Sequence, residues 1–164
     1  ISMGGSDKYD ITGRIVKQLK KTKFDFSAFI VLGKFYSNSK KIHHILQNDK
    51  RFILVDNTKN LHEIIIKCQF GIISFGITVY EAVALNIPTL VISHSFENHF
   101  SAKRIEKYGW YEYLGKYDNI NYSKVIDKII SNLTQKKRLK IKKPNLIDSK
   151  GPNRICKKIL ELKM

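Results

Sequence analysis

The stretch GIISFGITVYEAVALNIPTLVISHSFEN, residues 71–98, decides the fold of this chain. Its apolar spacing predicts, in order, a strand at 71–74, a turn at Gly76, a helix at about 78–85, a strand at 89–93 and a polar loop ending in Glu97-Asn98. Such a strand–turn–helix–strand segment is the βαβ unit of a parallel sheet, and ligands bind beyond the carboxyl ends of its strands. The turn also supplies a helix N-terminus, whose free backbone N–H groups favour an anion such as a phosphate.

The rest of the chain alternates strand-like and helix-like segments in the same way. We expect strands at 26–32, 52–55 and 111–114, with the end of a strand at 1–3. We expect helices at 12–21, 39–47, 61–66, 99–108, 122–133 and 152–162. This alternation predicts an α/β three-layer sandwich with a mainly parallel, Rossmann-like sheet. No internal repeat or linker is visible, so we expect residues 1–164 to form a single domain.

The composition is that of a globular protein, because 43% of the 164 residues are hydrophobic. No apolar run approaches the roughly 20 residues that span a bilayer. The first residues lack a signal peptide, and the chain does not begin with methionine. We therefore expect a fragment of a longer cytoplasmic protein. Its two cysteines, Cys68 and Cys156, are expected to be buried free thiols.

Lysine and arginine outnumber aspartate and glutamate by 30 to 14, a formal net charge of +16. Such an excess favours nucleic acid, anionic lipid or a polyanionic substrate as partner. The basic residues are dispersed along the chain, and the one dense run, at 136–143, has neither interleaved aromatics nor an RNA-binding motif. We expect a solvated surface that weakly steers anions, with no specific nucleic acid and with peripheral contact to an anionic membrane. A basic nucleic-acid-binding module stays an alternative.

The turn at Gly76-Ile77-Thr78 is the strongest candidate for a binding site. Its N–H groups and the Thr78 hydroxyl would face a diphosphate, and Glu81 lies on the same helix face as Thr78. The Glu81 carboxylate could then accept hydrogen bonds from sugar hydroxyls. The same spacing also fits a capping box, in which Thr78 is the N-cap and Glu81 reaches back to it. Spacing alone leaves both interpretations open.

Two further segments follow predicted strands. The turn GGSD at 4–7 has glycines that would let the backbone pass close to a ligand, although such a turn before a helix is more often structural. It is neither a Walker A loop nor a GxGxxG loop, so we do not expect kinase-like chemistry. His94 and His99 flank the Glu97-Asn98 segment, but nothing nearby completes a ligand set, and we predict no metal site.

Three segments together resemble one protein family: ISMGGSD at 1–7, NLHEIIIKCQFGIISFGITVYEAVALNIPTLVISHSFENHF at 60–100, and DSKGPNRICKKI at 148–159. They are similar to the C-terminal domain of the UDP-sugar hydrolases of pseudaminic acid biosynthesis and of the related spore-coat polysaccharide proteins. These belong to the GT-B glycosyltransferase superfamily. The resemblance keeps the order of the three segments and covers roughly residues 1–159.

The resemblance implies a domain that binds the UDP part of a UDP-amino-sugar without a metal or cofactor. The turn before the central helix would receive the diphosphate, Glu81 would bind the ribose hydroxyls, and uracil would lie around 55–61. The residues implied to contact substrate are Gly4, Gly5, Ser6, Gly76, Ile77, Thr78, Glu81, Glu97, Asn98 and His99.

Two residues depart from the family pattern. Relatives carry Gly-Gly-Thr where this chain has Gly76-Ile77-Thr78, which puts a β-branched side chain at the phosphate turn. Relatives also favour Gln after Glu-Asn, where this chain has His99. The family's hydrolases take their catalytic histidine from an N-terminal domain that this sequence lacks, so we expect no catalytic residue here.

The implied function is the UDP-binding half of an enzyme that hydrolyses a UDP-amino-sugar in surface-polysaccharide or nonulosonic acid biosynthesis. The partner would be the missing N-terminal GT-B domain. The alternative is the catalytic subunit of a two-subunit UDP-sugar glycosyltransferase. In that case the chain would dock on a separate acceptor-binding subunit, for which exposed aromatics at Trp110, Tyr111 and Tyr113 would suit.

Overall fold

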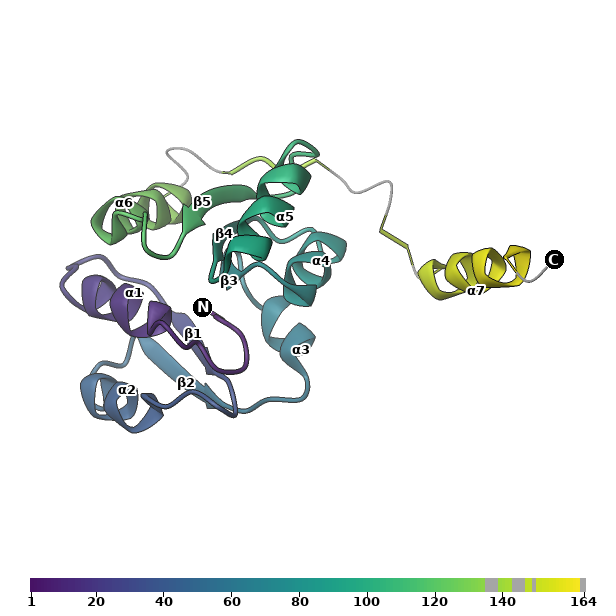
Figure 1. The fold of residues 1–164 in the computed structure, drawn as a ribbon. Helices are drawn as coiled ribbons and strands as arrows, with labels where there is room; N and C mark the ends of the chain where they lie inside the picture. The colour runs from purple at the N-terminus through teal and green to yellow at the C-terminus, as the bar shows by residue number, and fades with distance from the viewer. Residues whose placement is uncertain (135–138, 143–146, 149, 163–164) are drawn as a thin grey trace.

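A computed structural model describes residues 1–134, 139–142, 147–148 and 150–162. Helices and strands alternate along most of the described chain, which confirms the predicted α/β class (Figure 1). In chain order the elements are α1 (Ile11–Lys20), β1 (Ala28–Leu32), α2 (Ser39–Leu46), β2 (Phe52–Asp56), α3 (Leu61–Ile65), β3 (Gly71–Ser74), α4 (Ile77–Ala84), β4 (Thr89–Ser93), α5 (Phe96–Glu106), β5 (Glu112–Lys116), α6 (Tyr122–Leu133) and α7 (Gly151–Glu161).

All paired strands run parallel, in a two-stranded group β1-β2 and a three-stranded group β3-β4-β5. The first residues of the chain join the two groups, because Ser2 forms parallel bridges to Val31 of β1 and to Ile73 of β3. The strand order is therefore β2-β1-(1–3)-β3-β4-β5. This is the order 3-2-1-4-5-6 of a Rossmann fold, whose topological switch point lies between the first segment and β3.

Helices cover both faces of the sheet and make the predicted three layers. Figure 1 shows α1, α2 and α6 on one face and α3, α4 and α5 on the other. The two hydrophobic clusters of the protein follow the same division, one under each helical layer. Alternation along the strands feeds both clusters: in β3, for example, Ile72 belongs to the first and Ile73 to the second.

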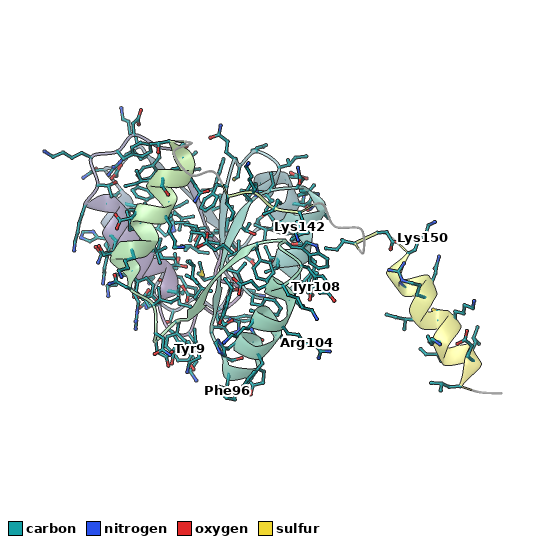
Figure 2. The ribbon with its side chains drawn as sticks, turned by 90° about the horizontal axis from the view of Figure 1, so that it is seen from above. Tyr9, Phe96, Arg104, Tyr108, Lys142 and Lys150 are labelled. Atoms are coloured by element: carbon teal, nitrogen blue, oxygen red, sulfur yellow. The ribbon has the colours of Figure 1, made fainter. Side chains whose placement is uncertain are left out.

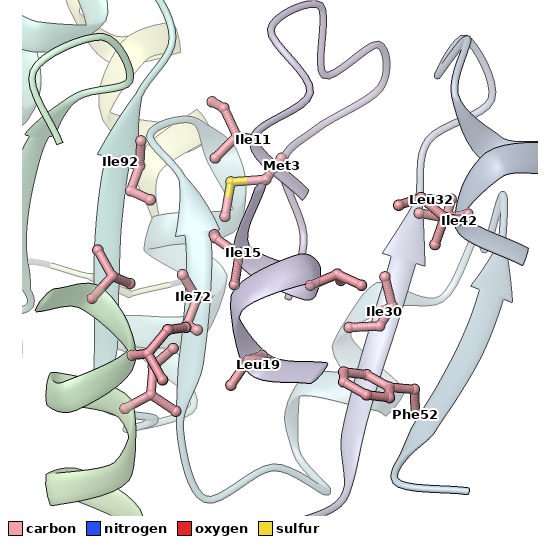
Figure 3. Packing of buried hydrophobic residues seen from close by; sticks show 14 of the residues in the cluster. Met3, Ile11, Ile15, Leu19, Ile30, Leu32, Ile42, Phe52, Ile72 and Ile92 are labelled. Atoms are coloured by element: carbon pink, nitrogen blue, oxygen red, sulfur yellow. The ribbon is translucent and has the colours of Figure 1, made fainter. Parts of the chain in front are cut away.

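The larger cluster is built around α1, which is amphipathic and lies over the middle of the sheet (Figure 3). Its apolar stripe, Ile11, Ile15, Val16 and Leu19, is at most 3% exposed. Full burial of one such side chain contributes about 1.5–3 kcal/mol, so this helix fixes the first glycine turn firmly against the sheet.

Three of the expectations from sequence need correction here. The prediction of a polar loop at 94–98 is wrong, because α5 already begins at Phe96. Cys68 and Cys156 are free as expected, but Cys68 is only half-buried and Cys156 is exposed. Trp110 and Tyr111 are 7% and 3% exposed, so the expected docking aromatics lie in the core. Tyr113 is half-buried.

The C-terminal part of the described chain differs from the sandwich. Helix α7 has no buried residue and lies apart from the sheet and its helices (Figure 1). Positions 136–138 and 143 of the basic run at 136–143 lie outside the described residues. None of the described helices is long and apolar enough to cross a membrane.

Candidate functional site

The structure brings the two predicted glycine turns together at the switch point of the sheet. Ser74 at the end of β3 donates its N–H to the Ser2 carbonyl at 3.0 Å. The ends of β3 and of the segment 1–3 therefore lie next to each other in the sheet. A Cβ built on Gly4 would lie 3.4 Å from the Ser74 Oγ. Gly4 also has φ +83°, a conformation that favours glycine. The turns after residue 3 and after residue 74 therefore share one edge.

The loop after β1 closes the first turn from the other side. A Cβ on Gly33 would meet the carbonyl oxygens of Gly5 and Gly4 at 2.3 and 2.4 Å, so only glycine fits there. Phe35 donates its N–H to the Gly5 carbonyl at 2.9 Å. The backbone of the first turn is thus held by its neighbours, while Gly4, Gly5 and Ser6 remain exposed.

The carboxylate of Asp7 occupies the N-terminus of α1. Its side chain accepts the N–H groups of Ile11 at 2.9 Å and of Thr12 at 2.8 Å, and it is only 7% exposed. Burial raises the pKa of Asp7 above its usual value. A bound phosphate would have to compete with this carboxylate, so α1 does not supply the anion site.

The N-terminus of α4 is open. Gly76 is its N-cap and makes no side-chain capping bond, and the helix begins at Ile77. Thr78 is therefore the second helical residue, and the capping-box interpretation of Thr78 and Glu81 is wrong. The N–H groups of Ile77 and Thr78 have no intrahelical partner, as at the start of any helix. Ile77, which carries the first of these donors, is 79% exposed, whereas Thr78 is half-buried.

Thr78 and Glu81 flank this open helix end. Thr78 is half-buried and lines a small, mostly apolar cavity of about 30 Å³ between α3, α4 and the sheet, together with Ile65 and Ala82. Glu81 is half-buried, and its carboxylate has no hydrogen bond or ion pair to any described residue. A partly desolvated carboxylate without a protein partner one turn inside the helix is able to accept ligand hydroxyls.

The predicted Glu-Asn segment lies in the first turn of α5. Ser95 is the N-cap and accepts the Asn98 N–H at 3.2 Å, a spacing that sequence inspection missed. Glu97 is exposed, and its pKa is held below the usual range by its own backbone N–H and by the Ser95 hydroxyl. The Glu97 carboxylate thus lies near the start of α5.

Asn98 ties α5 to the turn at Gly76. Its Nδ2 donates to the Phe75 carbonyl at 3.1 Å and lies 3.2 Å from the His94 Nε2. The Phe75 N–H in turn donates to the Ile92 carbonyl of β4 at 2.9 Å. The side-chain amide that was predicted to contact substrate is therefore already used to hold the peptide before Gly76.

His99 points toward β5, since its Nδ1 lies 2.7 Å from the Tyr113 hydroxyl. The predicted residues therefore divide into two groups. One group surrounds the switch point: Gly4, Gly5, Ser6, Gly76, Ile77, Thr78 and Glu81. The other group, Glu97, Asn98 and His99, forms the start of α5, and two of its side chains are bonded to the protein. Figure 2 shows Phe96 of this turn and Tyr9, which follows the first turn, at the same end of the molecule.

Two larger cavities lie away from this edge. One, of about 540 Å³, is lined by residues of α1, α2 and α6, and the other, of about 440 Å³, by residues near the amino ends of the strands. Among the described residues, no group of three or more His, Cys, Asp or Glu side chains is placed to hold a metal ion.

Comparison with known proteins gives one distant relative. Over 95 residues the chain is 27% identical to an uncharacterized protein of Methanocaldococcus jannaschii. The match covers 56% of this chain and 20% of that protein, so the chain spans about a fifth of the relative's length. No protein-family model and no solved structure matches the chain.

We predict that Asn98→Ala loosens the turn at Gly76. The lost hydrogen bond is worth about 1 kcal/mol, and the Val79 N–H, which donates to the Gly76 carbonyl at 3.1 Å, reports on opening of this turn. Hydrogen exchange followed by NMR should show the Val79 amide exchanging roughly fivefold faster than in the parent protein. Asn119→Ala, an exposed asparagine beyond β5, is the control. Equal exchange in both variants would contradict the positioning role of Asn98.

Proposed function

We propose that this chain is the UDP-binding half of a GT-B enzyme that hydrolyses a UDP-amino-sugar in the cytoplasm. The observation that carries the proposal is the open N-terminus of α4, at the switch point, beside the exposed turn at Gly4-Gly5-Ser6. A helix N-terminus with exposed N–H groups binds phosphate through these donors and the helix dipole. The distant relative carries no functional description, so the proposal stands on this geometry and on the family resemblance.

In this arrangement each part of UDP has a matching group. The diphosphate would lie against the N–H groups of Ile77 and Thr78. Glu81, one turn further along α4 and without a protein partner, would accept the ribose hydroxyls. The segment 57–60 follows β2 and lies at the same edge of the sheet, where it would contact the uracil ring.

The chemistry assigned to this half is stabilisation of the leaving group. Water would attack the anomeric carbon of the sugar, the bond from that carbon to the β-phosphate oxygen would break, and negative charge would develop on UDP. Donors that are already oriented at the start of α4 stabilise such charge without reorganisation. The base that accepts the proton from water would come from the domain across the cleft.

The apolar rim of the site is consistent with a covering domain. Four large side chains at this end of the molecule are strongly exposed: Phe35 at 73%, Ile77 at 79%, Phe96 at 62% and Phe100 at 57%. Exposed apolar groups that gather at a binding edge typically mark a surface that another protein surface covers. The hydrolase and the two-subunit transferase both require a second protein surface over this rim. The transferase alternative also relied on exposed aromatics, and Trp110 and Tyr111 are buried.

The first test removes one backbone donor. Proline is tolerated at the first position of a helix, so Ile77→Pro should delete the Ile77 N–H while preserving α4. Calorimetry with UDP should show about tenfold weaker binding, the expected loss for a hydrogen bond to a charged group. Ile77→Ala, which keeps the N–H and removes the same exposed side chain, should bind at least as well as the parent. Equal losses in both variants would exclude the α4 N-terminus as the phosphate site.

The second test concerns the ribose. Glu81→Ala should weaken UDP binding by about tenfold, because a charged acceptor of the ribose hydroxyls is lost. Asp127→Ala, on α6 at the opposite face, makes the same change in charge and should leave affinity unaltered. If Glu81→Ala binds UDP like the parent protein, Glu81 has no role in recognition. If the parent itself does not bind UDP, the proposed function fails.

A further inference from the structure

The fold gathers charges that look dispersed in the sequence. Along α1, α2 and α6, which cover one face of the sheet, seven positions are cationic and one is acidic. The cations are Arg14, Lys17, Lys20, Lys40, Lys41, Lys124 and Lys128, all exposed, and the acid is Asp127. We call this surface the cationic face.

On the helices of the opposite layer, acidic residues outnumber basic ones. Helices α3, α4 and α5 carry four acids, Glu63, Glu81, Glu97 and Glu106, against two cations, Lys103 and Arg104. A general excess of lysine in the composition would place similar numbers of cations on the helices of both layers. The difference in charge between these helices therefore arises from the way the chain folds. Within these six helices, the excess of positive charge therefore lies on the side of α1, α2 and α6.

The cationic face is a broad and shallow surface. Its centre is the hollow of about 540 Å³ lined by Arg14, Lys17, Lys20, Lys21 and Tyr122, among others. The Arg14 guanidinium lies 5.6 Å from the centre of the Tyr122 ring. Among the described residues, no acidic side chain lines the hollow. A ligand there would meet positive charge from several directions, above a lining that includes Ile45 and the Tyr122 ring.

The chemistry of this face favours lipid headgroups over nucleic acid. Six of the seven cations are lysines, which act as hydrated point charges, whereas arginine supplies the planar fork that suits bidentate nucleic-acid contacts. Tyr122, which is half-buried under Arg14, is the one Phe, Tyr or Trp on these three helices, so there is no stacking platform for bases. No large apolar side chain is exposed on them, so contact with a bilayer would be electrostatic.

We propose that the cationic face docks this protein reversibly on an anionic phospholipid bilayer. Each lysine near such a surface strengthens binding by roughly fivefold, and the attraction decays within a Debye length of the membrane. The face lies on the layer away from α4 and Glu81, so docking leaves the open helix end accessible. The proposal is independent of the identity of the nucleotide.

The test is sedimentation with phosphatidylcholine vesicles that contain or lack phosphatidylglycerol, at low and at high salt. The variant Lys17→Gln/Lys41→Gln/Lys124→Gln removes three charges from the cationic face, at side chains without hydrogen bonds or ion pairs to described residues. The control variant Lys67→Gln/Lys103→Gln/Arg104→Gln removes three charges from the other layer, so the two variants have the same net charge. We expect binding to anionic vesicles only, lost at high salt, and about 100-fold weaker in the first variant.

Several results would overturn the assignment. Equal losses in the two triple variants would show that net charge alone governs binding. Absence of binding to anionic vesicles at low salt, or equal binding to neutral vesicles, would exclude electrostatic docking. Stronger binding to a duplex oligonucleotide than to anionic vesicles, lost in the first variant alone, would assign the face to nucleic acid.

Discussion

The insertion of residues 1–3 into the middle of the sheet is the constraint on which the rest of the structure depends. The backbone hydrogen bonds that make it include those from Ser2 N–H to the Ile72 carbonyl, from Ser74 N–H to the Ser2 carbonyl, and from Val31 N–H to the Ile1 carbonyl, at 2.9–3.0 Å. The groups β1-β2 and β3-β4-β5 have no direct pairing with each other. This short segment therefore creates both the continuous sheet and its switch point.

The same constraint separates the roles of two neighbouring helix ends. Helices α1 and α4 both begin where the chain leaves the central strands, and both follow glycines. Asp7 occupies the first end and gives α1 a buried internal anion, whereas the second end has no capping side chain. Asn98 then holds the turn before α4 by its bond to Phe75. The protein thus builds one closed and one open N-terminus at the same edge.

Elements with a clear local pattern could be predicted from the sequence. The strands Gly71–Ser74 and Thr89–Ser93 and the helix Tyr122–Leu133 match their expected bounds, because buried parallel strands and amphipathic helices depend on their own apolar spacing. The start of α5 could not be placed, because its polar residues resemble a loop until the Ser95 cap is recognised.

Features that depend on tertiary contacts could not be predicted in the same way. The capping-box interpretation of Thr78 fails because α4 begins one residue earlier, at Ile77. The bond from Asn98 to Phe75 joins residues 23 positions apart. The segregation of charge appears only when the helices are assigned to the two faces of the sheet.

The most direct test of the central claim, that the ligand binds at the switch point, is an NMR titration of the backbone amides with UDP. We expect the amides of Gly4, Gly5, Gly76, Ile77 and Thr78 to shift together with one dissociation constant, while those of α1, α2 and α6 stay in place. Saturable shifts confined to the cationic face, or no shifts at the two glycine turns, would contradict the account.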